Sequence, residues 1–101
     1  MNTKNIFLIL IIAFLGNNSC FSQKFQPDTI ITYKKVGDIE LKLHVFYPKN
    51  IKEGKKTAAI VSFFGGGWTG GNPKQFYQQS AYYASRGMIA FSAEYRVFGK
   101  Y

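Results

Sequence analysis

Cysteine and histidine are almost absent from this sequence. Its 101 residues include one cysteine, Cys20, and one histidine, His44. A protein metal centre usually needs several such ligands at a regular spacing, so the sequence predicts no metal site. Cys20 also lies in the leader segment described below, so we expect neither a disulfide nor thiol chemistry in the rest of the chain.

The sequence also lacks a serine nucleophile motif. Ser62, Ser80, Ser85 and Ser92 all lack the flanking glycines of the Gly-x-Ser-x-Gly turn that exposes a catalytic serine. A histidine that acts as a general base needs a positioned nucleophile beside it. We therefore interpret His44 as a solvated strand residue rather than as a catalytic base.

Acidic residues are scarce, because 13 lysines and arginines face only 5 aspartates and glutamates, which gives a formal charge of +8. A basic balance is typical of proteins that bind nucleic acids or other anionic polymers. The lysines are scattered, however, and the densest cluster, Lys52–Lys56, has the composition of a solvated turn between strands. We therefore expect no nucleic-acid partner.

No apolar run is long enough to span a bilayer. The longest, Ile6–Leu15, follows the charge of Lys4 and is typical of the apolar region of a secretory signal. Small residues at Cys20 and Ser22 predict cleavage between Ser22 and Gln23. The alternative for this run is a buried strand or helix of a cytosolic domain.

The predicted cleavage divides the chain into a signal peptide, residues 1–22, and a mature part, residues 23–101. This division predicts an exported protein, periplasmic or extracellular. A lipoprotein anchored through an acylated Cys20 is the alternative, although Asn17 stands where the lipid-attachment signal prefers leucine.

The mature part opens with two predicted strands. Thr29–Val36 is rich in β-branched residues and is followed by a turn at Gly37. Ile39–Tyr47 alternates apolar and polar residues, which predicts an antiparallel strand with one buried face. Pro48 ends this strand, so the sequence predicts a β-hairpin.

Two further strands, with a helix between them, are predicted downstream. Ala58–Phe64 is apolar apart from Ser62, which is typical of a strand buried on both faces of a parallel sheet, and Met88–Ala93 is the next apolar strand. Between them, Asn72 is a predicted N-cap, Pro73–Arg86 a predicted helix, and Gly87 its end. This βαβ unit, with a right-handed crossover, places the chain in the α/β fold class.

A hairpin and one βαβ unit do not complete a parallel sheet, because they cannot cover both of its faces. One apolar strand, Ala58–Phe64 or Met88–Ala93, would remain as an exposed edge. We therefore expect the mature part to be an incomplete piece of a longer α/β domain, the alternative being a complete miniature domain.

Three consecutive glycines, Gly65–Gly67, directly follow the first predicted buried strand. Glycines let the backbone approach a ligand closely and adopt unusual dihedral angles. Successive N–H groups of such a loop can point at one position, as the developing oxyanion of an ester requires. A flexible loop selected for close packing is the alternative interpretation.

The region Ala59–Val97 resembles the start of α/β-hydrolase esterases of the hormone-sensitive-lipase-like kind. It is especially similar to bacterial secreted carbohydrate esterases, such as acetylxylan- or feruloyl-esterase-like proteins. Those families have a strand, a His-Gly-Gly-Gly-Trp loop, a helix and a strand that ends in Asp/Glu-Tyr-Arg. Here the loop is Phe64–Trp68 and the strand ends at Glu94–Arg96, and Leu41–Pro48 matches the family's edge strand.

The resemblance implies a serine carboxylic-ester hydrolase, acting on a small-molecule or carbohydrate ester without a cofactor. It implies that the backbone N–H groups of Gly66 and Gly67 are oxyanion donors. The family's serine, acid and histidine follow this loop, so they are expected beyond these 101 residues, which should be inactive alone. One departure is Phe64, which replaces the family's loop histidine and can brace the loop only by packing.

A dinucleotide-binding oxidoreductase is one alternative function. The stretch Gly65–Gly70 fits Gly-x-Gly-x-x-Gly, and Glu94 ends the next strand where a ribose-binding acid would lie. Trp68 would crowd the pyrophosphate, however, and the predicted helix starts only after the last glycine. We therefore expect Glu94 and Arg96 to hold structure, as an ion pair or through hydrogen bonds to nearby loops.

A non-catalytic exported carbohydrate-binding module is the other alternative. In that case Trp68, Phe76 and Tyr77 would stack on sugar rings, although core packing and pocket lining are the commoner roles of such aromatic residues.

Overall fold

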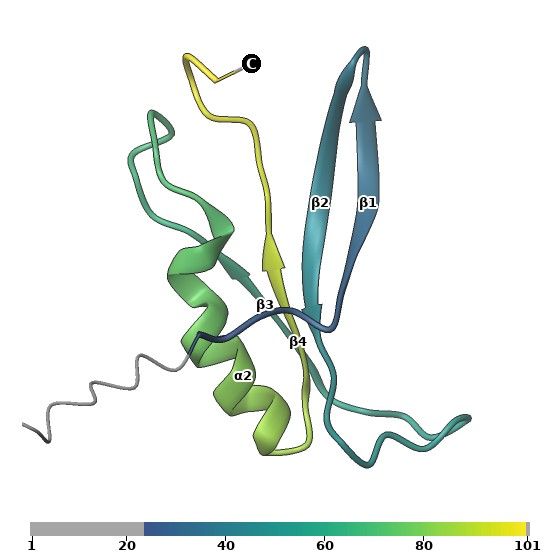
Figure 1. The fold of residues 1–101 in the computed structure, drawn as a ribbon. Coiled ribbons are helices and arrows are strands. Elements are labelled where there is room, and N and C mark those ends of the chain that lie inside the picture. The colour runs from purple at the N-terminus through teal and green to yellow at the C-terminus, as the bar shows by residue number, and fades with distance from the viewer. Residues whose placement is uncertain (1–23, 101) are drawn as a thin grey trace, which may run out of the picture.

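The computed structural model describes residues 24–100. The predicted signal peptide, its cleavage site and Cys20 lie outside these residues. The described part forms one sheet of four strands in the order β1-β2-β4-β3, with a helix packed on one face (Figure 1). No helix within residues 24–100 is long and apolar enough to cross a membrane.

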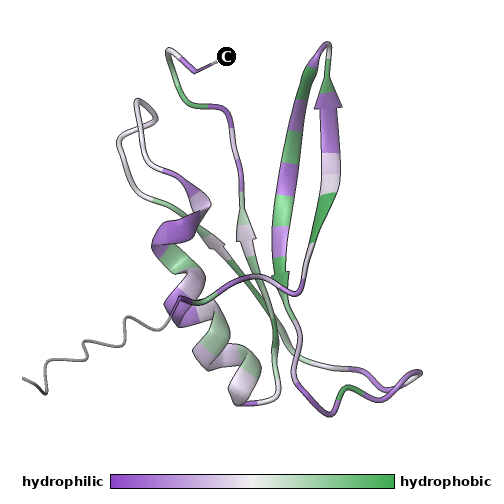
Figure 2. Cartoon of the chain, viewed as in Figure 1, coloured by the Kyte–Doolittle hydropathy of each residue, from purple (hydrophilic) through white to green (hydrophobic). Residues whose placement is uncertain are grey.

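Strands β1 (Thr29–Val36) and β2 (Ile39–Phe46) form the antiparallel hairpin that the sequence predicts. Gly37 makes the turn with a φ of +60°, a left-handed conformation that favours glycine. The pairing register shifts between Thr32 and Lys34, so β1 carries an irregularity in its middle. Figure 2 shows the alternation of polar and apolar residues along β2.

The βαβ unit is also confirmed. Strand β3 (Ala59–Phe63) leads through the glycine loop to a 3₁₀ turn, η1 (Pro73–Phe76), and then to helix α2 (Tyr77–Ser85). Strand β4 (Ile89–Ala93) follows and pairs with β3 in parallel. The predicted N-cap is correct, because the Asn72 side chain accepts a hydrogen bond from the Lys74 N–H at 2.9 Å.

The prediction that Ala58–Phe64 is buried on both faces is wrong for the described part of the chain. Val61 is 48% exposed and Phe63 is 60% exposed. The reason is that β3 lies at one edge of the sheet and pairs only with β4. The expectation of one exposed apolar edge strand is therefore confirmed, and β3 is that strand.

Strand β2 is buried more completely than its alternating pattern predicts. It pairs with β1 on one side and with β4 on the other, both antiparallel. His44 and Phe46, which belong to its predicted polar face, are both buried. Helix α2 covers this face, where the rings of Phe46 and Tyr77 meet edge to face at 5.4 Å. Phe46 and Tyr77 form the core cluster with Ala84 and Ala90.

Candidate functional site

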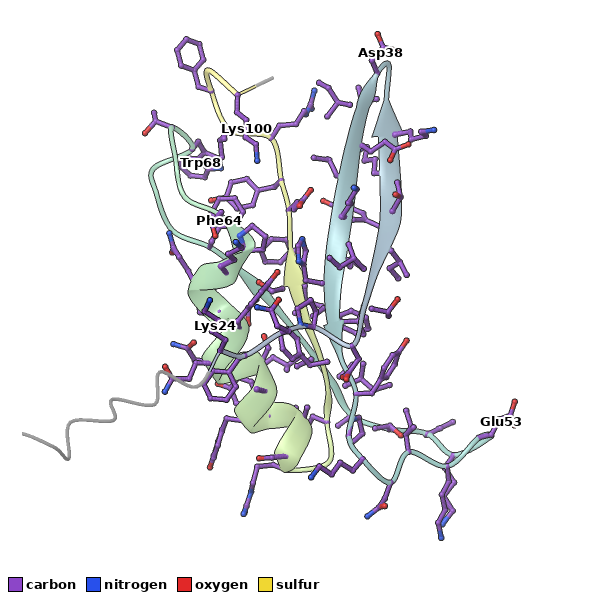
Figure 3. All side chains as sticks on the ribbon, viewed as in Figure 1. Lys24, Asp38, Glu53, Phe64, Trp68 and Lys100 are labelled. Carbon is purple, nitrogen blue, oxygen red and sulfur yellow. The ribbon has the colours of Figure 1, made fainter. Side chains whose placement is uncertain are left out.

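The glycine loop, defined here as residues 65–71, lies at the carboxyl end of β3. In open α/β sheets, ligands bind at the carboxyl ends of the strands. Figure 3 shows Phe64 and Trp68 at this end of the molecule, opposite to Glu53. The segment that follows β4 lies beside the loop, because the Phe98 N–H donates to the Trp68 carbonyl at 2.6 Å.

Two loop glycines are required by space. A Cβ at Gly66 would lie 2.2 Å from the carbonyl oxygen of Gly70, and one at Gly71 would lie 2.4 Å from that of Gly65. Both contacts are with backbone atoms, so a side chain at either position would force the loop to shift. The loop is therefore closely packed on itself, as one interpretation of the sequence proposed.

Gly67 differs from Gly66 and Gly71, because a Cβ at Gly67 would meet nothing within 4 Å. Gly67 has a φ of +59°, and Trp68 repeats this left-handed value, which costs a non-glycine residue about 1–2 kcal/mol. Trp68 is 73% exposed. Backbone strain of this kind concentrates at functional sites. The strained dipeptide is stabilised by Thr69, whose N–H and hydroxyl both donate to the Gly66 carbonyl, at 3.1 and 3.0 Å.

The N–H groups of Gly66 and Gly67 are the donors that the resemblance implies. Both glycines are exposed. Within residues 24–100, neither N–H has a hydrogen-bond acceptor. The two groups are therefore accessible to a ligand at the carboxyl end of β3.

Phe64, which replaces the family's histidine, is held by Tyr95. Phe64 is buried, and its ring stacks on the Tyr95 ring with centroids 4.3 Å apart. The Tyr95 hydroxyl also donates a hydrogen bond to the Phe64 carbonyl. On the other side of the loop, the Gln75 amide donates to the Gly65 carbonyl at 3.2 Å. Packing thus braces the loop at Phe64, as expected, and the two hydrogen bonds add to it; our sequence reasoning assigned Tyr95 no role.

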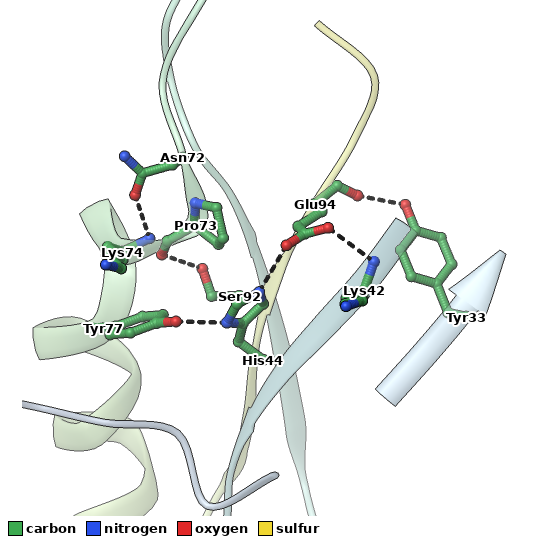
Figure 4. A network of polar contacts seen from close by, with 9 residues as sticks. All are labelled: Tyr33, Lys42, His44, Asn72, Pro73, Lys74, Tyr77, Ser92 and Glu94. Atoms are coloured by element: carbon green, nitrogen blue, oxygen red, sulfur yellow. Dashed lines mark hydrogen bonds and ion pairs between the residues drawn. The ribbon is translucent and has the colours of Figure 1, made fainter. Parts of the chain in front are cut away.

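The prediction that His44 is a solvated strand residue is wrong. Its side chain is buried between α2 and β4 (Figure 4). Nδ1 lies 2.5 Å from the Tyr77 hydroxyl, and Nε2 lies 3.0 Å from Glu94 Oε1. Burial raises the pKa of the Tyr77 hydroxyl above its ordinary value, and the Glu94 carboxylate raises it further.

Glu94 has a structural role, as expected, but its hydrogen bonds go to residues of strands rather than to loops. Its Oε2 accepts from the Lys42 N–H at 3.2 Å, and its backbone N–H donates to the Lys42 carbonyl at 2.9 Å. Its own carbonyl accepts from the Tyr33 hydroxyl at 2.5 Å. The expected ion pair with Arg96 is not formed in the described part of the chain, where Arg96 is exposed.

These contacts argue against two other roles for the buried groups. Both carboxylate oxygens of Glu94 are bonded internally, so Glu94 is not free for the ribose of a dinucleotide. The nearby Ser92 hydroxyl donates to the Pro73 carbonyl at 2.6 Å. Among residues 24–100, His44 therefore has no serine as its partner and forms no nucleophile–base pair.

Two further features of the described residues lie away from the loop. A groove at the opposite end of the sheet is lined by Phe46, Lys52, Lys56 and Gly87, among others, and includes none of the loop glycines. No group of three or more histidine, cysteine, aspartate or glutamate side chains is placed to hold a metal ion within residues 24–100.

No protein-family model matches the chain, and no curated protein sequence is significantly similar to it. Solved structures of esterase 2 from the planctomycete Thermogutta terrifontis do match. The propionate-bound form is 42% identical with a TM-score of 0.72, and the match covers 77% of this chain and 29% of that chain. The apo form is 41% identical with a TM-score of 0.73, covering 80% and 30%. The form phosphorylated by paraoxon is also 41% identical, with a TM-score of 0.73, covering 80% and 31%.

The chain thus spans about three tenths of the length of the esterase that it matches. The shared part contains the mixed sheet and the helix, so the α/β fold class is confirmed. In sequence and in fold, this chain is similar to part of an esterase of the α/β-hydrolase type, which confirms the resemblance that its glycine loop and strands indicate.

Proposed function

We propose that this chain is the opening part of the catalytic domain of a carboxylic ester hydrolase and supplies its oxyanion loop. Identity of 41–45% to esterase 2 carries this proposal. Gly66 and Gly67 support it, because both residues are exposed, their N–H groups have no acceptor within residues 24–100, and they lie where an α/β sheet binds its ligands.

The chemistry of ester hydrolysis explains what such a loop contributes. A serine oxygen adds to the ester carbonyl, and the carbonyl oxygen takes up negative charge in the tetrahedral intermediate. Backbone N–H groups already aimed at that oxygen stabilise the charge without having to reorganise, and removing one such donor typically costs a factor of about 10²–10³ in kcat.

In this proposal, residues outside these 101 supply the nucleophile, the acid and the catalytic histidine. About seven tenths of the matched esterase has no counterpart in the chain. His44 is not the catalytic histidine, because Tyr77 and Glu94 occupy its two nitrogens.

We further propose that the substrate is a short-chain acyl ester, with an acylated carbohydrate as the specific class. Structures of the matched esterase are bound to propionate and to butyrate, which supports a small acyl group. The exposed ring of Trp68 lies next to the proposed donors and offers an aromatic face of the kind on which sugar rings stack.

Covalent labelling tests the proposed activity. The complete protein should hydrolyse p-nitrophenyl acetate and release acetate from acetylated xylo-oligosaccharides. Paraoxon, which phosphorylates the matched esterase, should abolish this activity and add one diethylphosphoryl group by mass spectrometry. The 101 residues alone should neither hydrolyse the ester nor take the label. A complete protein that binds NAD but neither hydrolyses esters nor reacts with paraoxon would support the oxidoreductase instead.

We also propose that the protein is exported and that its leader is removed. The apolar run after Lys4 and the small residues Cys20 and Ser22 support this proposal. After expression in a bacterium, N-terminal sequencing of the exported protein should begin at or near Gln23. An intact Met1 would contradict it, and an acylated Cys20 would identify a lipoprotein.

A further inference from the structure

A tyrosine lies at each end of the glycine loop. Before the loop, Phe64 is held by the ring and the hydroxyl of Tyr95. After the loop, η1 leads into α2, whose first residue is Tyr77. These two tyrosines anchor the segments that enter and leave the loop.

One imidazole connects the two anchored segments. His44 Nδ1 bonds to the Tyr77 hydroxyl, after the loop, and His44 Nε2 bonds to Glu94, the residue directly before Tyr95 (Figure 4). His44 belongs to β2, and its two ring nitrogens bond to Tyr77 and Glu94, which lie outside the glycine loop. It therefore acts at a distance, through the two residues that it holds.

The hydrogen-bond chemistry gives this connection a direction. A carboxylate can only accept, so Nε2 donates its proton to Glu94. In a neutral imidazole the other nitrogen then accepts, so the Tyr77 hydroxyl donates to Nδ1. Glu94 is itself fixed by the Lys42 N–H, the Lys42 carbonyl and the Tyr33 hydroxyl. Each donor in this series of hydrogen bonds meets an acceptor, so the side chains of Tyr77, His44 and Glu94 are held in one arrangement.

We propose that His44 is a positioning residue for ester hydrolysis, which sets the spacing between the entry and the exit of the glycine loop through Glu94 and Tyr77. This inference rests on the proposed function of Gly66 and Gly67 as oxyanion donors. A displacement of about 1 Å in a catalytic group can cost about 10²-fold in rate, so a loop that is only slightly relaxed should be measurably slower.

The test uses the complete protein and three variants. Tyr77→Phe removes one hydroxyl and keeps the ring that packs on Phe46, and His44→Gln removes the imidazole. Glu40→Gln is the matched control, because it alters only exposed contacts of the hairpin, the ion pair to Lys35 and the hydrogen bond from Thr32. The first two variants should lower kcat about 10–10²-fold with KM nearly unchanged. The control should keep the wild-type kcat.

A sulfur-substituted substrate separates positioning from general damage. Sulfur is a weak hydrogen-bond acceptor, so a thionoester gains less from the oxyanion donors than its oxygen ester does. If His44 positions those donors, Tyr77→Phe and His44→Gln should lose much more rate with the oxygen ester than with the thionoester. Equal losses with both substrates would mean that the variants merely destabilise the protein, and would overturn the inference.

Amide hydrogen exchange tests the role of His44 even if the protein shows no esterase activity. The Thr69 N–H donates to the Gly66 carbonyl inside the loop, so its protection reports the loop's geometry. Exchange at Thr69 should be faster in both variants than in the wild type and the control. Unchanged exchange and kcat would refute the role of His44 while leaving the proposed function intact. An inactive wild type would refute the proposed function, and Thr69 exchange would still decide the role of His44. If His44→Gln does not fold, Tyr77→Phe alone decides it.

Discussion

At the scale of single residues, the loop glycines serve two different needs. Gly66 and Gly71 are required because the backbone of the loop passes within 2.4 Å of where their Cβ atoms would lie. Gly67 is in open space and is required only for its left-handed φ. In the sequence, Gly66 and Gly67 are two neighbours in a row of three glycines, and the difference between them arises from the fold of the loop.

The difference predicts unequal effects of substitution in the complete protein. Gly66→Ala should lower kcat about 10²–10³-fold, because the loop must shift and a donor is misdirected. Gly67→Asn should lose much less, since asparagine adopts the left-handed conformation readily. Steady-state kinetics with p-nitrophenyl acetate measures both. Gly37→Asn, at an open left-handed turn of the hairpin, is the control and should keep full activity. Wild-type turnover by Gly66→Ala would show that the loop only packs.

The Tyr77 hydroxyl predicts a loss of stability at alkaline pH. Its pKa is raised in the folded protein by burial and by Glu94, so the folded state holds this proton more tightly than the unfolded chain. The corresponding stability is fully present below the ordinary tyrosine pKa of about 10, and is lost as the pH rises through the raised pKa. Urea unfolding from about pH 8 to about pH 11 measures it. Tyr77→Phe should flatten the alkaline part of this curve, whereas Tyr82→Phe, at an exposed ring, should not.

At the scale of elements, the burial of β2 and of β3 is the reverse of what their sequences predict. The strand predicted to have one buried face has two, and the strand predicted to be buried on both faces is partly exposed. The alternating β2 pairs on both sides and lies under α2, so both of its faces contain buried residues. The continuously apolar β3 lies at an edge, and alternate residues are exposed. Periodicity reports how apolar each face is, whereas burial depends on which strands and helices become neighbours.

The exposed edge of β3 predicts self-association. An unpaired apolar edge strand is a template for pairing with a second chain. The isolated mature chain should therefore form oligomers whose size grows with concentration in sedimentation experiments. Phe63→Lys places a charge on this edge at a residue that is 60% exposed, and should shift the distribution toward monomer. Tyr82→Lys, on the exposed side of α2, is the control and should leave association unchanged.

At the scale of the whole molecule, the described part has a small core. One helix covers one face of the sheet, and the central cluster consists of Phe46, Tyr77, Ala84 and Ala90. The matched esterase is more than three times longer than the part that this chain covers. The TM-score of 0.73 over that part shows that the chain folds as the corresponding part of this longer esterase does.

This small core predicts weak cooperativity for the mature chain on its own. Burial of apolar surface is the main favourable term in folding, and a sheet with one bare face buries too little of it. Calorimetry of residues 23–101 should therefore show a broad transition with a small enthalpy. The complete protein should show a sharp one, and a sharp, concentration-independent melt of the short chain as a monomer would contradict this prediction.

Local chemistry was sufficient to predict the secondary structure, the helix cap and the glycine loop. The strand Thr29–Val36 is where its β-branched residues indicate, and Asn72 caps the turn that Pro73 begins. Each of these features depends on residues a few positions apart, whose conformational preferences and hydrogen bonds act within one element. The loop was also recognisable, because an apolar strand followed by three glycines is a local pattern.

The support of that loop was not predictable in this way. His44 meets Tyr77 across 33 positions of the chain and Glu94 across 50. They meet only because β4 inserts between β2 and β3 and because α2 returns over the same face. No local periodicity encodes such an order of strands, since it is set by the burial of the sheet as a whole. From the sequence alone, a single histidine on the polar face of a strand is therefore predicted to face solvent. In the assembled sheet, His44 is instead buried and bonded to two side chains.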